Sequence, residues 1–211
     1  MRVVFTTFFI TIFISSFAYS QYFWELKQSG SSLGGPIDVE KYNPNNVYYG
    51  SVNVIYKSTD RGETFSPLGT TLPNSSDVKN IIINDENPNE FLVAIESSGD
   101  KILKTTNAGV TWNIVADNLS FSFFGIPMTP DPSHPDTIYT MSGSNFMRST
   151  NFGDSWTTLT SSVGCATPCD IEVFADTNII LIGDNGTGIF RSTDYGLTWA
   201  QTHNTTGEIP T

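Results

Sequence analysis

An eleven-residue pattern recurs four times along this chain and constrains its fold more than any other feature. The copies read IYKSTDRGETF at 55–65, ILKTTNAGVTW at 102–112, FMRSTNFGDSW at 146–156 and IFRSTDYGLTW at 189–199. Their first Ser or Thr falls at positions 58, 105, 149 and 192, so the intervals are 47, 44 and 43 residues. A nearly constant period of this length indicates a repeat architecture in which each period folds as one unit.

Each period also contains short runs rich in Val, Ile, Tyr and Phe, separated by Gly, Asn, Asp and Pro. Such runs predict strands, and no window shows the sustained periodicity of a helix. In the second period we expect strands at 78–83, 91–95, 102–104 and 111–115. Four antiparallel strands per 43–47 residues are typical of a β-propeller blade. The sequence therefore predicts an all-β propeller with about four such blades.

The last eight residues of each copy, called the box below, are predicted to form the turn between the third and fourth strands. In the first box, Ser58 and Asp60 can accept hydrogen bonds from backbone N–H groups, and Gly62 can adopt a positive φ. Thr64 then starts the exit strand, and Phe65 turns inward as an apolar plug. The equivalent residues of the other three boxes are Thr105, Asn107, Gly109, Thr111 and Trp112; Ser149, Asn151, Gly153, Ser155 and Trp156; and Ser192, Asp194, Gly196, Thr198 and Trp199.

The residue type at the acidic position of the box distinguishes a turn-forming role from a catalytic or metal-binding role. It holds Asp60 and Asp194 in two copies but Asn107 and Asn151 in the other two. An amide oxygen accepts the same turn hydrogen bonds, but an amide cannot replace a catalytic acid or a charged metal ligand. We therefore interpret the boxes as scaffold, and the sequence predicts no catalytic residue, no cofactor and no metal site.

The boxes STDRGETF, TTNAGVTW, STNFGDSW and STDYGLTW closely resemble the Asp-box or BNR repeat, S-x-D-x-G-x-T-W. The resemblance spans about residues 24–201. That repeat is found in sialidases, xyloglucan-type glycoside hydrolases, photosystem II assembly factors and the sortilin ectodomain, and the blade style is most similar to sortilin-like, exported bacterial members. The resemblance implies a β-propeller, whereas the functions of the family are divided among hydrolases, receptors and assembly factors.

Two classes of function follow from this resemblance. The first is an exported scaffold that binds a protein or a glycan. The alternative is a glycoside hydrolase of the xyloglucan-active type whose site lies partly outside this chain. A sialidase of this family would hold its substrate carboxylate with three arginines. The arginines here are Arg2 near the N-terminus, Arg61 within a box, and Arg148 and Arg191 directly before boxes, so we expect no sialidase activity.

The boxes and the Pro-Asn turns are expected on one face of the propeller, and any pocket over the axis on the opposite face. The loops of that opposite face contain Asp77, Asp117, Phe121, Asp170 and Asp184. Phe121 is placed either to stack on a sugar beside Asp117 or to pack inside the fold. Asp184 lies in GDNGTG, which forms either a calcium loop or a Gly-rich hairpin turn. Asp77, Asp117 and Asp170 also suit a hydrolase, although no motif selects a catalytic pair.

Residues 1–20 have the pattern of a signal peptide. Arg2 precedes the uncharged stretch VVFTTFFITIFISSFA, and AYS offers a cleavage site before Gln21. The stretch is short and rich in Thr and Ser, which disfavours the alternative of a membrane anchor. We therefore expect 21–211 to be secreted, periplasmic or on the cell surface, without membrane insertion after cleavage. Without Arg2 the net charge is near −12, since 9 Lys plus Arg face 21 Asp plus Glu, and such an acidic chain repels nucleic acid.

Two cysteines, Cys165 and Cys169, lie in the sequence CATPC. Export favours a disulfide between them. A metal site would need further thiol or imidazole ligands, and only His134 and His203 are present in the chain.

A count of strands predicts an incomplete ring. The segment YFWELKQSG at 22–30 resembles the strands that follow the boxes, so we expect the chain to open on a fourth strand. It would then hold five fourth strands but four sets of the other three. We therefore expect the amino-terminal portion of a longer protein, and an open arc whose exposed blade edges favour self-association.

Overall fold

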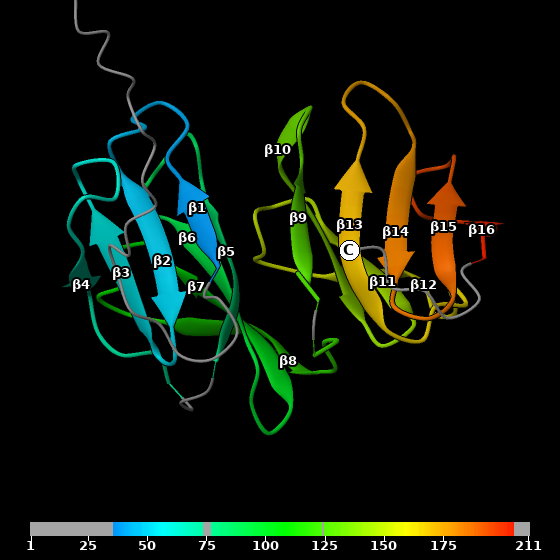
Figure 1. Cartoon of the computed structure of the whole chain (residues 1–211), viewed down its shortest axis with the longest axis horizontal. Helices are drawn as coiled ribbons and strands as arrows, with labels where there is room; N and C mark the ends of the chain where they lie inside the picture. Colours follow the sequence, from blue (N-terminus) through cyan, green and yellow to red (C-terminus); the bar gives the residue numbers. More distant parts are fainter. Residues whose placement is uncertain (1–35, 74–76, 124, 205–211) are drawn as a thin grey trace, which may run out of the picture.

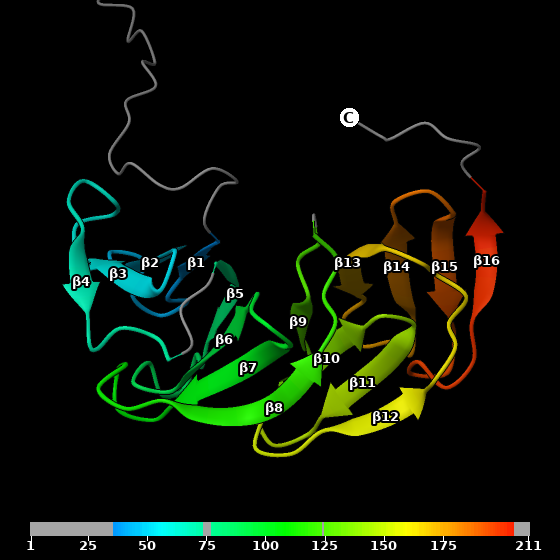
Figure 2. The ribbon, with the colours of Figure 1, turned by 90° about the horizontal axis from the view of Figure 1, so that it is seen from below.

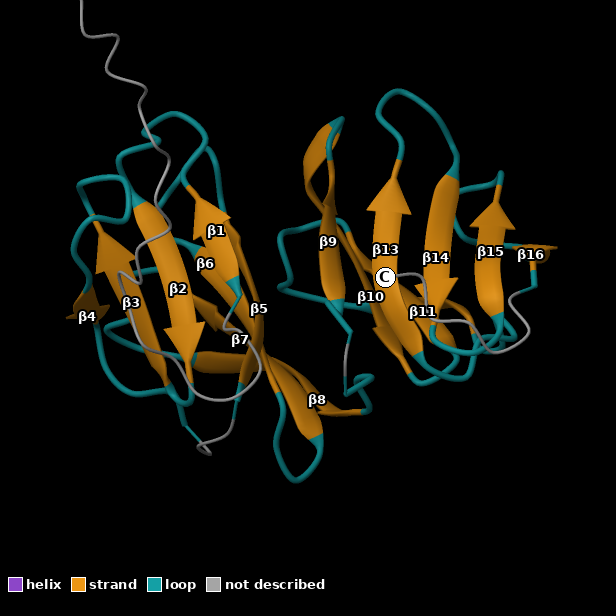
Figure 3. Cartoon of the chain, viewed as in Figure 1, coloured by secondary structure: helices purple, strands orange, loops and turns teal. Residues whose placement is uncertain are grey.

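A computed structural model describes residues 36–73, 77–123 and 125–204. This part of the chain forms sixteen strands in four antiparallel sheets of four strands each (Figures 1 and 3). The strands are β1 (Ile37–Val39), β2 (Val47–Ser51), β3 (Val54–Ser58), β4 (Ser66–Leu68), β5 (Val78–Ile83), β6 (Phe91–Ile95), β7 (Asp100–Thr105), β8 (Asn113–Leu119), β9 (Met128–Asp131), β10 (His134–Ser142), β11 (Asn145–Ser149), β12 (Thr157–Thr160), β13 (Pro168–Val173), β14 (Ile180–Asp184), β15 (Gly188–Ser192) and β16 (Ala200–His203).

Each sheet contains four strands that follow one another in the chain, in spatial order one to four. Figure 2 shows the sheets side by side in an arc, with β1, β5, β9 and β13 on its inner side and β4, β8, β12 and β16 on its outer side. The first and fourth sheets lie at the two ends of this arc. The predicted fold class, a propeller of four-stranded antiparallel blades, is confirmed.

The strand bounds agree closely with the sequence in the second sheet. The structure has β5 at Val78–Ile83 and β6 at Phe91–Ile95, as predicted, but β8 runs to Leu119 rather than ending near residue 115. Leu119 still pairs with Asp100 across a register shift, which prolongs the ladder. The strand predicted at 22–30 and the signal peptide at 1–20 lie outside the described residues.

Apolar side chains between successive sheets form three cores, because the second and third sheets pack on both faces and the two end sheets pack on one. The core between the first two sheets contains Tyr48 and Ile55 from one and Phe91 and Leu103 from the other. The second and third sheets share a core of the same kind, and so do the third and fourth. Burying Leu, Ile or Phe side chains in this way contributes about 1.5–3 kcal/mol each.

The boxes are turns built on one buried hydroxyl and one side-chain oxygen. In the first box Ser58 Oγ accepts from the N–H of Gly62 at 2.8 Å, and it donates to Asp60 Oδ1 at 2.6 Å. Asp60 Oδ1 accepts from the N–H of Thr64 at 2.9 Å. In the second box Asn107 Oδ1 accepts from the N–H of Thr111 at the same distance, 2.9 Å.

One hydrogen bond in the box reverses its direction when Asn replaces Asp. Thr64 Oγ1 donates to Asp60 Oδ2 at 2.6 Å, whereas Asn107 Nδ2 donates to Thr111 Oγ1 at 2.9 Å. A threonine hydroxyl can donate or accept, so it suits either partner. The geometry explains how Asn and Asp serve in the same turn.

Acid should weaken the two boxes that contain Asp. The pKa of Asp60 is lowered to about 2, mainly by hydrogen bonds from Ser58 and Thr64, and that of Asp194 to about 2, mainly by hydrogen bonds from Thr198. A carboxylate whose pKa is lower in the folded chain contributes stability above its unfolded pKa, near 3.9, and loses it as pH falls through the folded pKa. The double variant Asp60→Asn/Asp194→Asn should therefore lose less stability than the parent between about pH 4 and pH 2.

Denaturant unfolding at pH 7 and at pH 2.5–4 measures this difference. At pH 7 we expect the double variant to match the parent closely, because Asn107 and Asn151 already serve in the other two boxes. A double variant with the same acid sensitivity as the parent would contradict this account.

Candidate functional site

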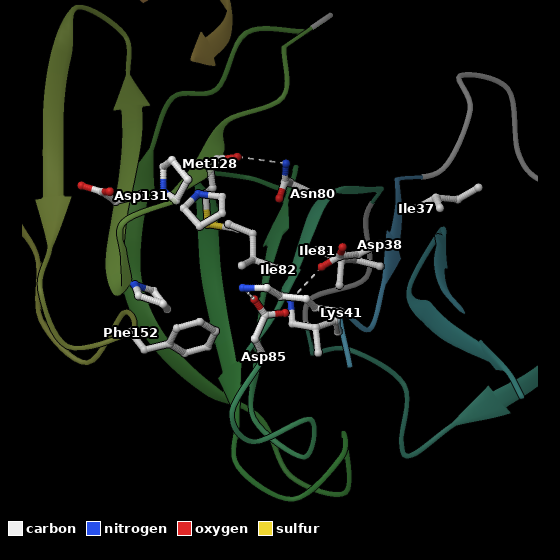
Figure 4. Close-up of a pocket in the computed structure, with 14 residues that line it drawn as sticks. Ile37, Asp38, Lys41, Asn80, Ile81, Ile82, Asp85, Met128, Asp131 and Phe152 are labelled. Carbon is white, nitrogen blue, oxygen red and sulfur yellow. Dashed lines mark hydrogen bonds and ion pairs between the residues drawn. The ribbon is translucent and has the colours of Figure 1, made fainter. Parts of the chain in front are cut away.

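A groove with a volume of about 380 Å³ lies among strands β1, β5 and β9 (Figure 4). Strands β1, β5 and β9 and the turns that follow them supply most of its lining, and Pro135 of β10 and Phe152 of the third box complete it. A volume of this size is in the usual range for small-molecule sites. Its apolar lining is Ile37, Ile81, Ile82, Ile83, Met128, Pro130, Pro132, Pro135 and Phe152, and its polar lining is Asp38, Lys41, Asn80, Asp85 and Asp131.

Two backbone N–H groups hold the carboxylate of Asp38 in this groove. Its Oδ2 accepts from the N–H of Ile83 at 2.8 Å, so it links β1 to β5 of the next sheet (Figure 4). Its Oδ1 accepts from the N–H of Val39, also at 2.8 Å. Burial raises the pKa of Asp38; the two N–H donors oppose this rise, and the nearby charge of Asp85 adds to it.

The other two carboxylates of the groove have defined partners. Asp85 Oδ2 lies 3.2 Å from Lys41 Nζ, and this contact raises the pKa of Lys41 (Figure 4). Asp131 is buried and accepts from the N–H groups of Ser133 and His134 at 2.9 and 3.2 Å. Asp131 therefore stabilises its turn, whereas Asp38 and the Lys41–Asp85 pair lie where a ligand can reach them.

The groove carries a net negative charge. Three carboxylates line it, and Lys41 is the single Lys or Arg among its lining residues. Such a site disfavours an anionic ligand and suits a neutral ligand that offers hydroxyl donors to carboxylates. The prolines and Met128 provide apolar surface beside these acceptors.

The groove lies on the side of the turns that follow the inner strands, and not on the opposite side as the sequence suggested. On that opposite side the described residues form a crevice of about 10 Å³, which is close to the space of one water molecule. The reason is that buried carboxylates tie the loops of that side to neighbouring hairpins. Asp100 Oδ2 accepts from the N–H of Phe121 at 2.6 Å, and Asp184 Oδ2 accepts from the N–H of Thr167 at 2.6 Å.

The structure does not assemble the five predicted binding-face residues into one site. Asp184 is buried, and it also accepts from the N–H of Thr187 at 3.1 Å, so it serves a hairpin turn. Phe121 packs against the core between the second and third sheets. Asp117 forms an ion pair with Lys101, which lowers the pKa of Asp117.

The remaining two residues of that face are exposed on different sheets. Asp77 precedes β5, and its carbonyl accepts from the N–H of Glu96. Asp170 lies in β13, and its side chain accepts from the adjacent N–H of Ile171 at 3.0 Å. Asp77 and Asp117 thus belong to the second sheet and Asp170 to the fourth, and none of the three lines the groove.

Cys165 and Cys169 are free thiols in the structure, which differs from the predicted disulfide. Cys165 is buried in the core between the third and fourth sheets. Cys169 lies in β13, is partly exposed, and donates its S–H to the carbonyl of Thr167 at 3.3 Å. The two side chains therefore lie in different surroundings, Cys165 in the core and Cys169 partly exposed on β13.

The two thiols should react at very different rates. Burial, with a smaller contribution from the charge of Asp184, raises the pKa of Cys165 to about 11. Alkylation at pH 8 should therefore modify Cys169 in the folded chain and reach Cys165 after unfolding, because the thiolate is the reactive species. Intact-mass measurement gives the count. One adduct before unfolding and two after it is the expected result, whereas no adduct in unreduced, unfolded chain would establish the disulfide instead.

Two other features are absent from the described residues. No group of three or more His, Cys, Asp and Glu side chains is placed to hold a metal ion there. No helix in the same part of the chain is long and apolar enough to cross a membrane.

Sequence reasoning missed the groove residues Asp38, Lys41, Asp85 and Asp131. The sequence does carry a signal, because each of the first three inner strands contains or is closely followed by an Asp, in IDVEK, INDE and TPDP. Since the inner strands of a propeller converge on the axis, these carboxylates meet on one side of the arc. The positions of Lys41 and the three prolines depend on turn conformation and gave no comparable signal.

The known proteins that this chain resembles include glycoside hydrolases and YCF48. No family model matches the chain. A xyloglucanase of Paenibacillus sp. is 30% identical over 165 residues, which are 74% of this chain and 14% of that enzyme. The chain thus spans 14% of the length of the curated relative that it matches.

Solved structures with the same fold come from both groups. An ancestral GH74 enzyme has a TM-score of 0.64 at 21% identity, covering 85% of this chain and 25% of the enzyme. The GH74 enzyme of Niastella koreensis has a TM-score of 0.59 at 20% identity, with coverage of 79% and 24%. YCF48 of Cyanidioschyzon merolae has a TM-score of 0.56 at 15% identity, with coverage of 82% and 57%. These likenesses show the fold, and the chain is a β-propeller protein similar to GH74 glycoside hydrolases and to YCF48.

Proposed function

We propose that this chain binds a neutral β-glucan of the xyloglucan type through the groove on the inner side of its arc. The observation that carries the proposal is its 30% identity over 165 residues to a xyloglucanase. The acidic groove supports it, because neutral sugars offer many hydroxyl donors and no negative charge. Export to a compartment that contains polysaccharide is part of the same proposal.

Hydrolysis by this chain is the second candidate, and Asp38 favours it. A glycosidase needs one carboxyl group that stays protonated and one that stays ionised. Burial raises the pKa of Asp38, whereas Asp85 lies against Lys41. Binding remains the primary proposal, because Asp38 is also held by two backbone N–H groups that fix its position.

Calorimetric titration with a xyloglucan oligosaccharide tests binding. We expect the parent chain to bind and Asp38→Asn to bind about tenfold more weakly or worse, since a hydrogen bond to a charged acceptor contributes about 1.5–3 kcal/mol. Asp60→Asn is the matched control, because it makes the same chemical change at a residue that does not line the groove. Equal binding by both variants, or no binding by the parent, would exclude the groove as the site.

A reducing-sugar assay on the same samples separates the two candidate functions. Release of reducing ends by the parent and not by Asp38→Asn would make Asp38 a catalytic acid. Binding without release would support the scaffold alone. A sialoside should not be cleaved by either sample, because the groove lining contains no Arg.

A further inference from the structure

The first sheet has a face that no other sheet of the arc covers. Its aromatic centre is Tyr49, which is 8% exposed and whose ring centroid lies 6.2 Å from that of Tyr56 and 6.2 Å from that of Phe65. On the inner strand β1, Ile37 is 65% exposed and Val39 is 44% exposed. These five residues are called the head face below.

The strand pairing shows that the head face is equivalent to the face with which the second sheet packs against the first. Val39 pairs with Val47 in the first sheet as Ile83 pairs with Phe91 in the second. Ile83 and Phe91 belong to the core between the first two sheets. In the same register, Ile37, Tyr49, Tyr56 and Phe65 correspond to Ile81, Val93, Leu103 and Trp112, and these four also pack in or against that core.

The fourth sheet has the complementary half at the other end of the arc. Each earlier sheet places two side chains in the core that it shares with the next sheet: Tyr48 and Ile55, Leu92 and Ile102, Tyr139 and Phe146. By strand register the fourth sheet has Leu181 and Ile189 at these positions. Ile189 is 39% exposed, although its three counterparts are fully buried. Leu181, Ile189 and the adjacent Arg191 are called the tail face below.

Charge also matches between the two faces. Between the second and third sheets, Lys104 Nζ lies 2.6 Å from Asp154 Oδ1 of the next box. Arg191 is the equivalent of Lys104 in the fourth sheet. Arg191 pairs with Leu181 of β14, as Lys104 pairs with Leu92 of β6. Glu63 occupies in the first box the position that Asp154 occupies in the third. A tail face placed on a head face would therefore bring Arg191 close to Glu63.

We infer that the head face binds the tail face of a second copy of this chain. Figure 2 shows that the two end sheets stand on either side of the open part of the arc. A head-to-tail contact of this kind is heterologous, and it closes when the rotation returns to the start. The second copy would then extend the arc past the head face with its own four described sheets.

Sedimentation velocity of the chain from residue 21 onward, across the micromolar range, tests this inference. We expect a dimer. Ile37→Asp on the head face and Ile189→Asp on the tail face should each raise the dimer dissociation constant about tenfold or more. Ile114→Asp is the matched control, because Ile114 is 46% exposed on β8, on the outer edge of the second sheet. It should leave the dimer intact.

Mixing the two variants distinguishes a head-to-tail contact from a contact between identical faces. Ile37→Asp keeps a normal tail face and Ile189→Asp keeps a normal head face, so an equimolar mixture should associate more strongly than either variant alone. Glu63→Arg and Arg191→Glu should each weaken the dimer roughly fivefold, and the double variant should recover it.

Four outcomes would overturn the inference. They are a monomeric parent at every concentration, a dimer that Ile114→Asp disrupts as strongly as the face variants, a mixture that gains nothing, and a monomer that dimerises when residues 21–35 are removed. The last outcome would mean that this segment, and not a second copy, covers the head face. Circular dichroism of each variant confirms that a loss of association is not a loss of fold.

Discussion

Replacing Gly153 with valine is expected to lower the free energy of unfolding by about 3–5 kcal/mol, whereas the same change at Gly62 should cost about 1–2 kcal/mol. Both glycines hold the same position in their boxes and have nearly the same backbone, with φ of 82° and 87°. The backbone strain of a β-branched residue at positive φ is therefore common to the two variants. The difference between them measures packing alone.

The packing difference arises from the neighbouring sheet. A Cβ on Gly153 would lie 2.6 Å from Leu92 Cδ2 of the second sheet, closer than carbon atoms approach in proteins. A Cβ on Gly62 would meet the ring of Phe65 at 3.7 Å, which is ordinary contact. Since the first box has no preceding sheet against it, valine at Gly62 has room that valine at Gly153 lacks.

Urea unfolding of the two variants in dilute solution gives both values. Equal losses of stability would show that strain dominates and that Leu92 moves aside at little cost. Concentration provides a further control. If a second copy covers the head face, the cost of Gly62→Val should rise with chain concentration while that of Gly153→Val stays constant.

The fold could be predicted from the sequence because the repeat fixes it at several levels. The period sets the length of a blade, the box sets the turn between its last two strands, and the β-type runs set the rest. These signals are local, so one sequence carries all of them. The extension of β8 to Leu119 escaped prediction because it depends on pairing with Asp100, nineteen residues away in the chain.

The groove could not be predicted because its residues come from three sheets. Asp38 bonds to the N–H of Ile83, forty-five residues away, and the sequence alone does not give the angle between their sheets. The sequence also could not give the tertiary contacts of the residues on the predicted binding face. Asp184 and Phe121 are residues of types that often serve ligands, but Asp184 bonds to the Thr167 N–H and the Phe121 N–H bonds to Asp100. Local composition gives the residue type, and tertiary packing decides its use.

The role of Lys104 also depends on tertiary contacts that the sequence does not give, and its substitution is expected to have a large effect on stability. The sequence marks it as the cation before the second box, equivalent to Lys57 in the first sheet. In the structure its side chain is 5% exposed, and its Nζ lies 2.7 Å from Glu90 and 2.6 Å from Asp154. Burial lowers the pKa of Lys104, but the hydrogen bonds to Asp154 and Glu90 outweigh it, and the pKa is raised overall.

Lys104→Met should therefore lower the free energy of unfolding by about 2–3 kcal/mol, although methionine keeps the length of the side chain. The cause is Glu90, which is largely buried and would lose its cation; Asp154 is exposed and can be hydrated by water. Adding Glu90→Gln should recover much of the loss, because a neutral amide costs less to bury unpaired than a carboxylate.

Lys57→Met is the matched control for this experiment. Lys57 has the same register, but its Nζ lies 4.9 Å from the centroid of the Tyr48 ring rather than against a buried carboxylate. We expect this change to cost about 1 kcal/mol or less. Unfolding by urea, with hydrogen exchange at β7 and β11, gives both the total loss and its location. Because Lys104 joins the second sheet to Asp154 of the third, its loss should speed exchange on both sides of that junction, and Lys57→Met should not. An equal effect of the two variants would mean that the charge of the cation, and not its buried partner, determines the stability of the junction.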